Sequence, residues 1–104
     1  MLKHVYHPKR LVVLQPVLTI TGKVVETRKE PDGDFHILLD NRMECEIICA
    51  HEVTQKDAVQ ACKNYTNKVT VPRKGNNVKV TGQHVYDKVH KHEEIHPVFE
   101  LKIL

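Results

Sequence analysis

Alternating apolar and polar residues predict a curved first strand over residues 17 to 27. Leu18, Ile20 and Val24 fall on one face of an extended chain, and Gly22 interrupts that series. A glycine inside a strand usually marks a bulge or a sharp bend. We therefore expect this strand to bend in its middle.

Two further strands are predicted to follow without a change in pattern. The turn-forming sequence KEPDGD at 29 to 34 leads into alternation over 35 to 40, and Asn41-Arg42 leads into a third alternating stretch over 43 to 49. Asp-Gly after proline is a strong turn signal between strands. The first half of the chain is thus predicted to form three consecutive strands.

After residue 53 the spacing of the apolar residues changes from that of a strand to that of a helix. Thr54 and Asp57 resemble a capping box with Asp in place of Glu. A weak apolar stripe with helical spacing follows, formed by Ala58, Ala61, Cys62 and Tyr65. One short helix ending near Asn64 is predicted.

The pattern in the last third of the chain predicts two more strands on either side of a histidine-rich loop. Val78 and Val80 alternate before a second mid-strand glycine, Gly82, and the final strand places Phe99 and Leu101 on one side. Five strands with a helix between the third and fourth is the order of an OB-fold, a small partly open Greek-key barrel. The rival is a three-strand meander packed on a helix, with a separate hairpin.

We therefore predict an all-β barrel domain with one short helix over residues 17 to 104, and an N-terminal extension over residues 1 to 16 packed on it. The side chains predicted to lie inside are Leu18, Ile20, Ile37, Leu39, Ile47, Val80, Phe99 and Leu101. The chain of 104 residues suits one domain with one modest core.

The net charge and the hydropathy exclude only a few classes of protein. The formal net charge of +3 permits nucleic acid as a partner without requiring it. No apolar run is long enough to predict a membrane span, and the first residues lack the small-residue cleavage site of a signal peptide.

Two motifs resemble those of a known group of proteins. DGDFHI at 32 to 37 and EIHPV at 94 to 98, with weaker matches along nearly the whole chain, resemble small microbial OB-fold-like proteins of uncharacterised function. In that group the position before the first long strand is often cysteine, whereas here it is Val17. The resemblance implies an OB-like fold and an exported, extracytoplasmic protein, but no reaction.

The three cysteines leave two interpretations open. Cys49 and Cys62 either form a bridge worth about 3 kcal/mol on the chain-entropy model or remain two buried thiols, and the spacing alone does not decide. The resemblance to exported proteins favours the disulfide. Cys45 is predicted to be a free, buried core residue, and the three thiols do not form a zinc-binding pattern.

Two Asp/Glu-x-His pairs are candidates for a polar site. Asp34 and His36 project to one side of a strand, as do Glu94 and His96, and carboxylates with imidazoles bind metals and transfer protons. The starts of the second and fifth strands can lie at opposite ends of such a barrel, however. We therefore favour structural roles for these residues and expect no metal site. The exposed pair His90-x-His92 is predicted to be solvated.

Basic residues in two loops suggest nucleic acid as the ligand. OB-folds bind single strands on the face of strands two and three, between loops that here carry Lys23, Arg28, Lys29, Lys88 and Lys91. Stacking requires aromatic side chains, however, and the chain has only two Phe, three Tyr and no Trp. Glu44 and Glu46 also place negative charge on the outer face of the third strand, so the predicted affinity is weak.

We therefore predict a non-enzymatic OB-fold binding module without a cofactor, with single-stranded nucleic acid as its leading ligand. One alternative is a metal-dependent or hydrolytic protein that uses Asp34, His36, Glu94 and His96. Another is an extracytoplasmic module that binds a protein or a component of the cell envelope. No nucleophile motif and no phosphate-binding glycine loop favours an enzyme.

Overall fold

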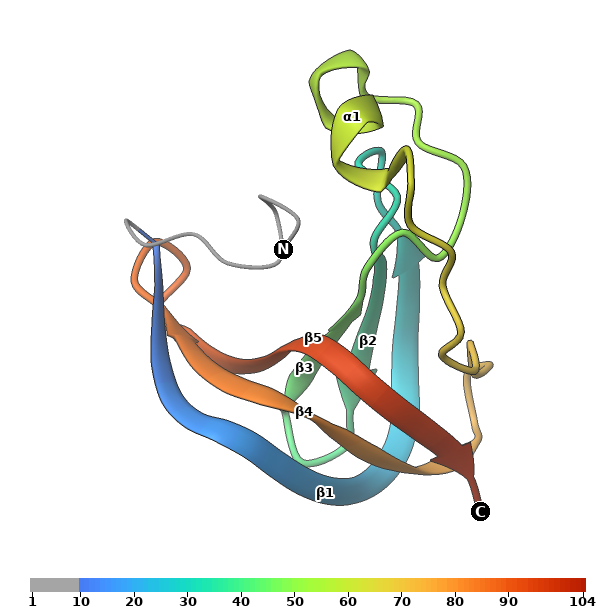
Figure 1. The fold of residues 1–104 in the computed structure, drawn as a ribbon. Coiled ribbons are helices and arrows are strands. Elements are labelled where there is room, and N and C mark those ends of the chain that lie inside the picture. Colours follow the sequence, from blue (N-terminus) through green and yellow to red (C-terminus); the bar gives the residue numbers. More distant parts are fainter. Residues whose placement is uncertain (1–9) are drawn as a thin grey trace.

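The computed structural model describes residues 10 to 104 and shows five strands closed into a barrel, with one short helix between the third and fourth (Figure 1). The elements are β1 (Leu11–Lys29), β2 (Phe35–Leu39), β3 (Glu44–Ile47), a 3-10 turn η2 (Lys56–Ala58), α1 (Val59–Cys62), β4 (Asn77–Asp87) and β5 (His92–Ile103). The mostly-β architecture with one short helix is thus confirmed.

The strands follow one another around the barrel in the order β1-β2-β3-β5-β4, and β4 pairs back onto β1. Four of the five pairings are antiparallel, whereas β3 and β5 run parallel, with Glu44 opposite Glu94 and Cys45 opposite Ile95. This parallel pairing brings the start of β5 beside β3, a neighbour distant in sequence.

β1 is long enough to pair with both β4 and β2, and in Figure 1 it curves beneath the other strands. Its first part pairs with β4 as far as Lys23 opposite Asn77, and its last part pairs with β2 from Val24 opposite Leu39. Gly22 lies where the partner changes, and a Cβ there would lie 3.2 Å from the Cβ of Leu39. The bend predicted from this glycine therefore coincides with a close approach between strands.

Gly82 occupies the bulge predicted for it. The register between β4 and β5 shifts on both sides of Gly82, and a Cβ there would lie 2.4 Å from both the Ile95 side chain and the Pro97 carbonyl oxygen. Only glycine lets the two strands approach this closely.

The core lies inside the barrel and contains most of the predicted residues. Ile37, Leu39, Ile47, Val80 and Leu101 are buried, as predicted. Leu18 and Ile20 are partly buried and pack against the same cluster, which also contains Val24, Val78, Ile95 and Val98.

The prediction that Phe99 lies inside is wrong. Its side chain is 52% exposed, whereas Val98 is buried. Val98 pairs with Gly82 and Glu100 pairs with Thr81, so Phe99 is the extra residue of a bulge in β5. The bulge shifts the alternation by one residue, because an unpaired residue changes which side chains face the core.

The barrel begins earlier than the sequence pattern indicates. Residues 11 to 16 were predicted to belong to an extension, but they form the first part of β1 and begin its pairing with β4. Leu11 is buried opposite Asp87. Residues 1 to 9 of the predicted extension lie outside the described residues.

The helix also differs from its prediction at the N-terminus. Its first residue is Lys56 in η2, and none of the described side chains forms a capping hydrogen bond there. The backbone NH of Thr54 instead donates to the carbonyl oxygen of Pro31, 2.9 Å away, so Thr54 is held by the β1–β2 loop. Tertiary hydrogen bonds therefore override the local capping pattern.

The predicted Cys49–Cys62 disulfide is present and joins the segment after β3 to the end of α1, with 5.6 Å between the two Cα atoms. Cys45 is free and buried, as predicted. Among the described residues, every helix is too short or too polar to cross a membrane.

Candidate functional site

A polar hollow of about 510 Å³ lies over the start of β5 and the faces of β2 and β3 that point away from the core. We name it the acidic hollow. It is lined by Arg10, Arg28, Glu30, Asp32, Asp34, His36, Glu44, Glu46, Asp87, His90, His92, Glu94 and His96. These side chains come from the residue before β1, the end of β1, the β1–β2 loop, the β2–β3 pair, the end of β4, the β4–β5 turn and the start of β5.

The acidic hollow concentrates negative charge in a chain that is net positive. Seven of the thirteen acidic residues line it, against two arginines, which leaves five net negative charges when its histidines are neutral. The whole chain carries a formal charge of +3. A concave surface lined by one sign of charge concentrates counter-ions of the other sign, so this hollow attracts cations.

The β2–β3 pair builds the floor of the hollow through its register. His36 lies directly opposite Glu46, and Glu44 projects to the same side because it is two residues away. The Nδ1 of His36 donates to Glu46 Oε1 at 2.9 Å, and its Nε2 lies 3.3 Å from Glu44 Oε1. Both ring nitrogens of His36 therefore face carboxylates.

The start of β5 adds a second set of ligand-type atoms through its parallel pairing with β3. Glu94 lies opposite Glu44, and His92 and His96 share its side of the strand. The Nδ1 of His96 donates to Glu94 Oε1 at 3.1 Å, and the Nε2 of His92 lies 2.9 Å from Glu94 Oε2. His92 Nε2 also forms an ion pair with Glu44 Oε2. The two halves of the hollow thus meet at Glu44.

The β4–β5 turn forms the rim. Asp87 is buried, and its carboxylate accepts hydrogen bonds from the backbone NH groups of Val89 and His90 and from His90 Nδ1. Arg10 Nε lies 3.3 Å from the same carboxylate, and the rings of His90 and His92 stack at 5.7 Å. Asp87 therefore fixes the turn that carries two histidines to the hollow.

These contacts change the acidities of three residues in the hollow. The hydrogen bond to Glu46 raises the pKa of His36, although burial opposes it. Burial raises the pKa of Glu46, partly offset by His36. Burial would also raise the pKa of Glu94, but hydrogen bonds from His96 and His92 outweigh it and lower that pKa. Imidazole and carboxylate groups in the hollow are therefore electrostatically coupled.

The structure brings together the four residues that the sequence singled out in pairs. Asp34 and His36 from the start of β2 line the same hollow as Glu94 and His96 from the start of β5. Such a barrel can place these strand starts at opposite ends, but here β2 and β5 pair with the two sides of β3, and residues of both line one hollow. His90 and His92 join them from the rim.

Sequence reasoning missed the roles of several lining residues. The sequence pattern indicates Glu44 and Glu46 only as charge on the outer face of β3, and it does not single out Glu30, Asp87 or Arg10. The spacing Glu44-x-Glu46 was the available signal, because a tight hairpin places it opposite the start of β2, where Asp34 and His36 lie.

The basic residues predicted to bind nucleic acid occupy different places. Arg28 lines the acidic hollow and pairs with Glu30 at 2.8 Å, a contact that raises the pKa of Arg28. Lys23 pairs with Asn77 at the first residue of β4, whereas Lys88 and Lys91 follow its last residue. Lys23 therefore lies at the opposite end of β4 from the two loop lysines.

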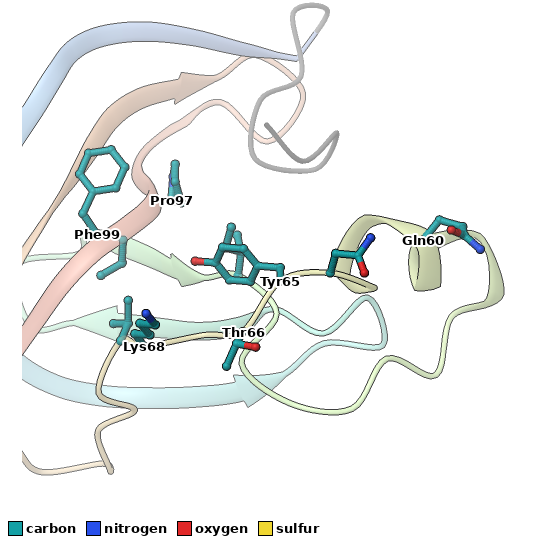
Figure 2. Close-up of a pocket in the computed structure, with 10 residues that line it drawn as sticks. Gln60, Tyr65, Thr66, Lys68, Pro97 and Phe99 are labelled. Atoms are coloured by element: carbon teal, nitrogen blue, oxygen red, sulfur yellow. The ribbon is translucent and has the colours of Figure 1, made fainter.

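A second hollow, of about 720 Å³, lies between β5 and the segment that follows α1 (Figure 2). Phe99 and Pro97 line it from β5, and Tyr65, Thr66 and Lys68 line it from the other side. We name it the aromatic hollow. The exposed faces of Phe99 and Tyr65 are the aromatic surface that the sequence pattern failed to predict.

Three groups of side chains among the described residues bring ligand-type atoms within 4.8 Å of one another. These groups are Glu30, His36 and Glu46; Glu44, His92 and Glu94; and Asp87, His90 and His92. All eight residues of these groups line the acidic hollow, and His92 belongs to two of the groups. The Oε2 atom of Glu46 is buried and accepts no hydrogen bond from the described part of the chain.

Comparisons of the chain with protein-family models, with curated proteins and with solved structures gave no match. The resemblance to small microbial OB-fold-like proteins therefore stays a prediction.

Proposed function

We propose that this barrel is a binding module for a divalent transition-metal cation, held in the acidic hollow. The observation that carries the proposal is the group Glu30, His36 and Glu46, whose ligand-type atoms lie within 4.8 Å of one another. Within it, Glu46 Oε2 is buried without a hydrogen-bond donor from residues 10 to 104. A buried oxygen without a donor is costly unless a cation or water satisfies it.

The donor set favours metals of the zinc class. Imidazole nitrogen together with carboxylate oxygen suits Zn²⁺, Fe²⁺, Co²⁺ and Ni²⁺, whereas Ca²⁺ and Mg²⁺ favour oxygen donors alone. Thiolate-dependent metals are disfavoured, because Cys49 and Cys62 are bridged and Cys45 is buried on the core side of β3. The five net negative charges of the hollow supply the attraction.

The hollow leaves space for a ligand besides the protein side chains, since it encloses about 510 Å³. A metal with an open coordination position can bind water or a small anion, the feature on which hydrolytic metal sites depend. This space supports metal binding with exchange at the ion and not a closed structural site.

Titration of the metal-free protein with Zn²⁺ in a calorimeter tests the proposal. We expect saturable binding that Glu46→Gln weakens roughly 100-fold, because the substitution removes one charged ligand while keeping the shape of the side chain. Glu100→Gln is the matched control, since Glu100 is exposed on β5 and pairs only with Lys102 among its described neighbours. Equal affinities of the two variants, or no zinc binding by the wild type, would contradict the proposal.

We also infer that the barrel is an OB-fold. Three features support this assignment: the order β1-β2-β3-β5-β4, the parallel pairing of β3 with β5, and the helix between β3 and β4. The acidic hollow then covers the outer face of strands two and three, where proteins of this fold bind their ligands.

Single-stranded nucleic acid remains a second candidate ligand, and a separate observation favours it. Phe99 is 52% exposed and Tyr65 is 38% exposed at the aromatic hollow, beside Lys68. Bases stack on exposed aromatic rings while lysines contact phosphates. Replacing Tyr65 and Phe99 together with Ala should abolish oligonucleotide binding in fluorescence anisotropy; unchanged binding would remove this hollow from consideration.

A further inference from the structure

We propose that single-stranded nucleic acid binds along residues 63 to 74, with its bases stacked in the aromatic hollow. This inference rests on the second candidate ligand of the proposed function and deepens it by assigning the surface that contacts the strand; it does not depend on the metal. We name residues 63 to 74 the basic segment, because all four of its charged residues are cations. They are Lys63, Lys68, Arg73 and Lys74.

Charge is divided between two regions of the chain. All thirteen acidic residues lie outside residues 58 to 86, and that stretch carries five lysines and arginines. The rest of the chain, which includes the acidic hollow, is therefore net negative. A polyanion is attracted to the first region and repelled by the second.

The cations of the basic segment are available to contact phosphates. All four residues are exposed, and none of them forms an ion pair within residues 10 to 104. By contrast, both arginines that line the acidic hollow are paired with carboxylates. An unpaired cation gives up no protein partner when it binds a phosphate, and its binding releases counter-ions that were condensed on the nucleic acid.

The fold holds the basic segment in place beside the aromatic hollow. In Figure 1 the chain after α1 runs along one side of the barrel to the start of β4. The side-chain amide of Asn67 bonds both the NH and the carbonyl oxygen of Val69, which packs against the core. Just past the segment, the Gly75 NH donates to the carbonyl oxygen of Val24 at 2.8 Å. The four cations are therefore carried by a segment that is fastened at two points.

The aromatic hollow provides a place for unstacked bases. Figure 2 shows Phe99 of β5 on one side of it and Tyr65 of the basic segment on the other, and Lys68 lines the same hollow. Both rings are exposed. Stacking on such rings tolerates any base, because every base has a π-face. The bases of a duplex already stack on one another, so a single strand suits this hollow and a duplex does not.

This surface differs from the face of strands two and three at which proteins of the OB-fold bind their ligands. In this barrel that face carries the acidic hollow, with five net negative charges when its histidines are neutral. Phosphates are repelled there, because the charges lining a concave surface act together. The loop residues Lys29 and Lys88 therefore lie outside the proposed path of the strand.

Two matched double substitutions test the location of the strand. Lys68→Ala with Lys74→Ala removes two charges from the basic segment. Lys29→Ala with Lys88→Ala removes two charges elsewhere, and all four lysines are exposed, so both variants should fold like the wild type. Binding of a labelled oligothymidine of about ten nucleotides is measured by fluorescence anisotropy at low salt. The first pair should weaken it at least about tenfold and reduce the slope of log K against log salt by about 1.4, and the second pair should weaken it less than about threefold.

Photo-crosslinking locates the bases. An oligothymidine that carries a photoreactive thymine should cross-link to peptides containing Tyr65 or Phe99, identified by mass spectrometry. Equal weakening by the two double substitutions, or cross-links confined to β2 and β3, would overturn the proposed location while leaving nucleic-acid binding intact. Displacement of the oligonucleotide by oligoglutamate at equal concentration would show a surface for any polyanion and would overturn the inference. Absence of binding by the wild type at protein concentrations on the order of tens of micromolar would overturn both the inference and the candidate ligand.

Discussion

The two faces of the β2–β3 pair differ in composition, burial and charge. On the core face, Ile37, Cys45 and Ile47 are fully buried among apolar side chains. On the other face, His36 faces Glu44 and Glu46, whose side chains are 23% and 14% exposed. Because side chains alternate along a strand, the same few residues build both the core and the acidic hollow.

This difference separates the face that stabilises the barrel from the face that we propose to bind a cation. Burial of apolar surface contributes about 25 cal/mol per Å² to folding, and the core face supplies it. Carboxylates gathered on the other face repel one another, a cost that their pairing with imidazole and guanidinium groups offsets. Apart from Asp87, which holds the β4–β5 turn, the side chains of the hollow are therefore expected to add less to stability than the core does.

Truncation of an apolar side chain on the core face should have the largest effect on the free energy of unfolding. Ile37→Ala should lower the free energy of unfolding by about 3 to 4 kcal/mol, since it leaves a cavity at a fully buried position. Ile103→Ala, at a side chain that is 49% exposed, is the control and should cost less than about 1 kcal/mol. Urea-induced unfolding measures both, and equal losses would show that the barrel interior does not determine stability.

Removal of the disulfide should rank next. Replacing Cys49 and Cys62 together with Ala should lower the free energy of unfolding by about 3 kcal/mol, because the bridge restricts the unfolded chain.

In the wild type without reductant, alkylation should modify Cys45 only after unfolding, because burial raises the pKa of its thiol. Intact-mass measurement should show one modified thiol in the unfolded protein; three would refute the bridge.

Replacing the buried carboxylate of Asp87 should lower the free energy of unfolding by an intermediate amount that depends on pH. Hydrogen bonds from His90 and the Val89 NH, with the charge of Arg10, outweigh burial and lower the pKa of Asp87. Its stabilising contribution is therefore present above the ordinary pKa of aspartate and is lost as the pH falls through the folded-state pKa. Asp87→Asn should cost about 2 kcal/mol at pH 7.

Thermal unfolding of both proteins across a pH series checks this effect. The difference in stability between wild type and Asp87→Asn should shrink below pH 4, where aspartate is protonated in the unfolded chain as well. A difference that stays constant from pH 7 to pH 3 would show that the charge of Asp87 does not contribute.

The smallest effect on stability is expected from the exposed lysines. Replacing Lys29 and Lys88 together with Ala should change the free energy of unfolding by less than about 0.5 kcal/mol, since both side chains are exposed. If these residues contact phosphates, the variant should bind a labelled oligonucleotide more weakly, with a flatter dependence on salt. Fluorescence anisotropy at low salt decides this, and absence of binding by the wild type at tens of micromolar protein would exclude the nucleic-acid hypothesis.

Local alternation was sufficient to predict much of the core and to single out four of the thirteen residues that line the acidic hollow. Ile37, Leu39 and Ile47 follow directly from strand periodicity, and the same period places Asp34 beside His36 and Glu94 beside His96. The cysteine pairing was also predicted, although only with the help of the family resemblance.

The remaining features depend on contacts between distant segments. The convergence of His36 and His96 requires the parallel β3–β5 pairing, which no local pattern encodes. The exposure of Phe99 requires a bulge opposite Gly82, and the late helix start requires the hydrogen bond from Thr54 to Pro31. Each of these contacts is decided by tertiary packing and not by the propensity of the residues concerned.

The Cys49–Cys62 bridge gives the acidic hollow a dependence on redox conditions. The segment it fastens holds the β1–β2 loop through the NH groups of Ala50, Thr54 and Gln55, and the ring of His51 binds the carbonyl oxygen of Asp34. That loop carries Asp32 and Asp34 to the rim of the hollow. Reduction of the disulfide would release this attachment, so the proposed cation binding should weaken in a reducing compartment.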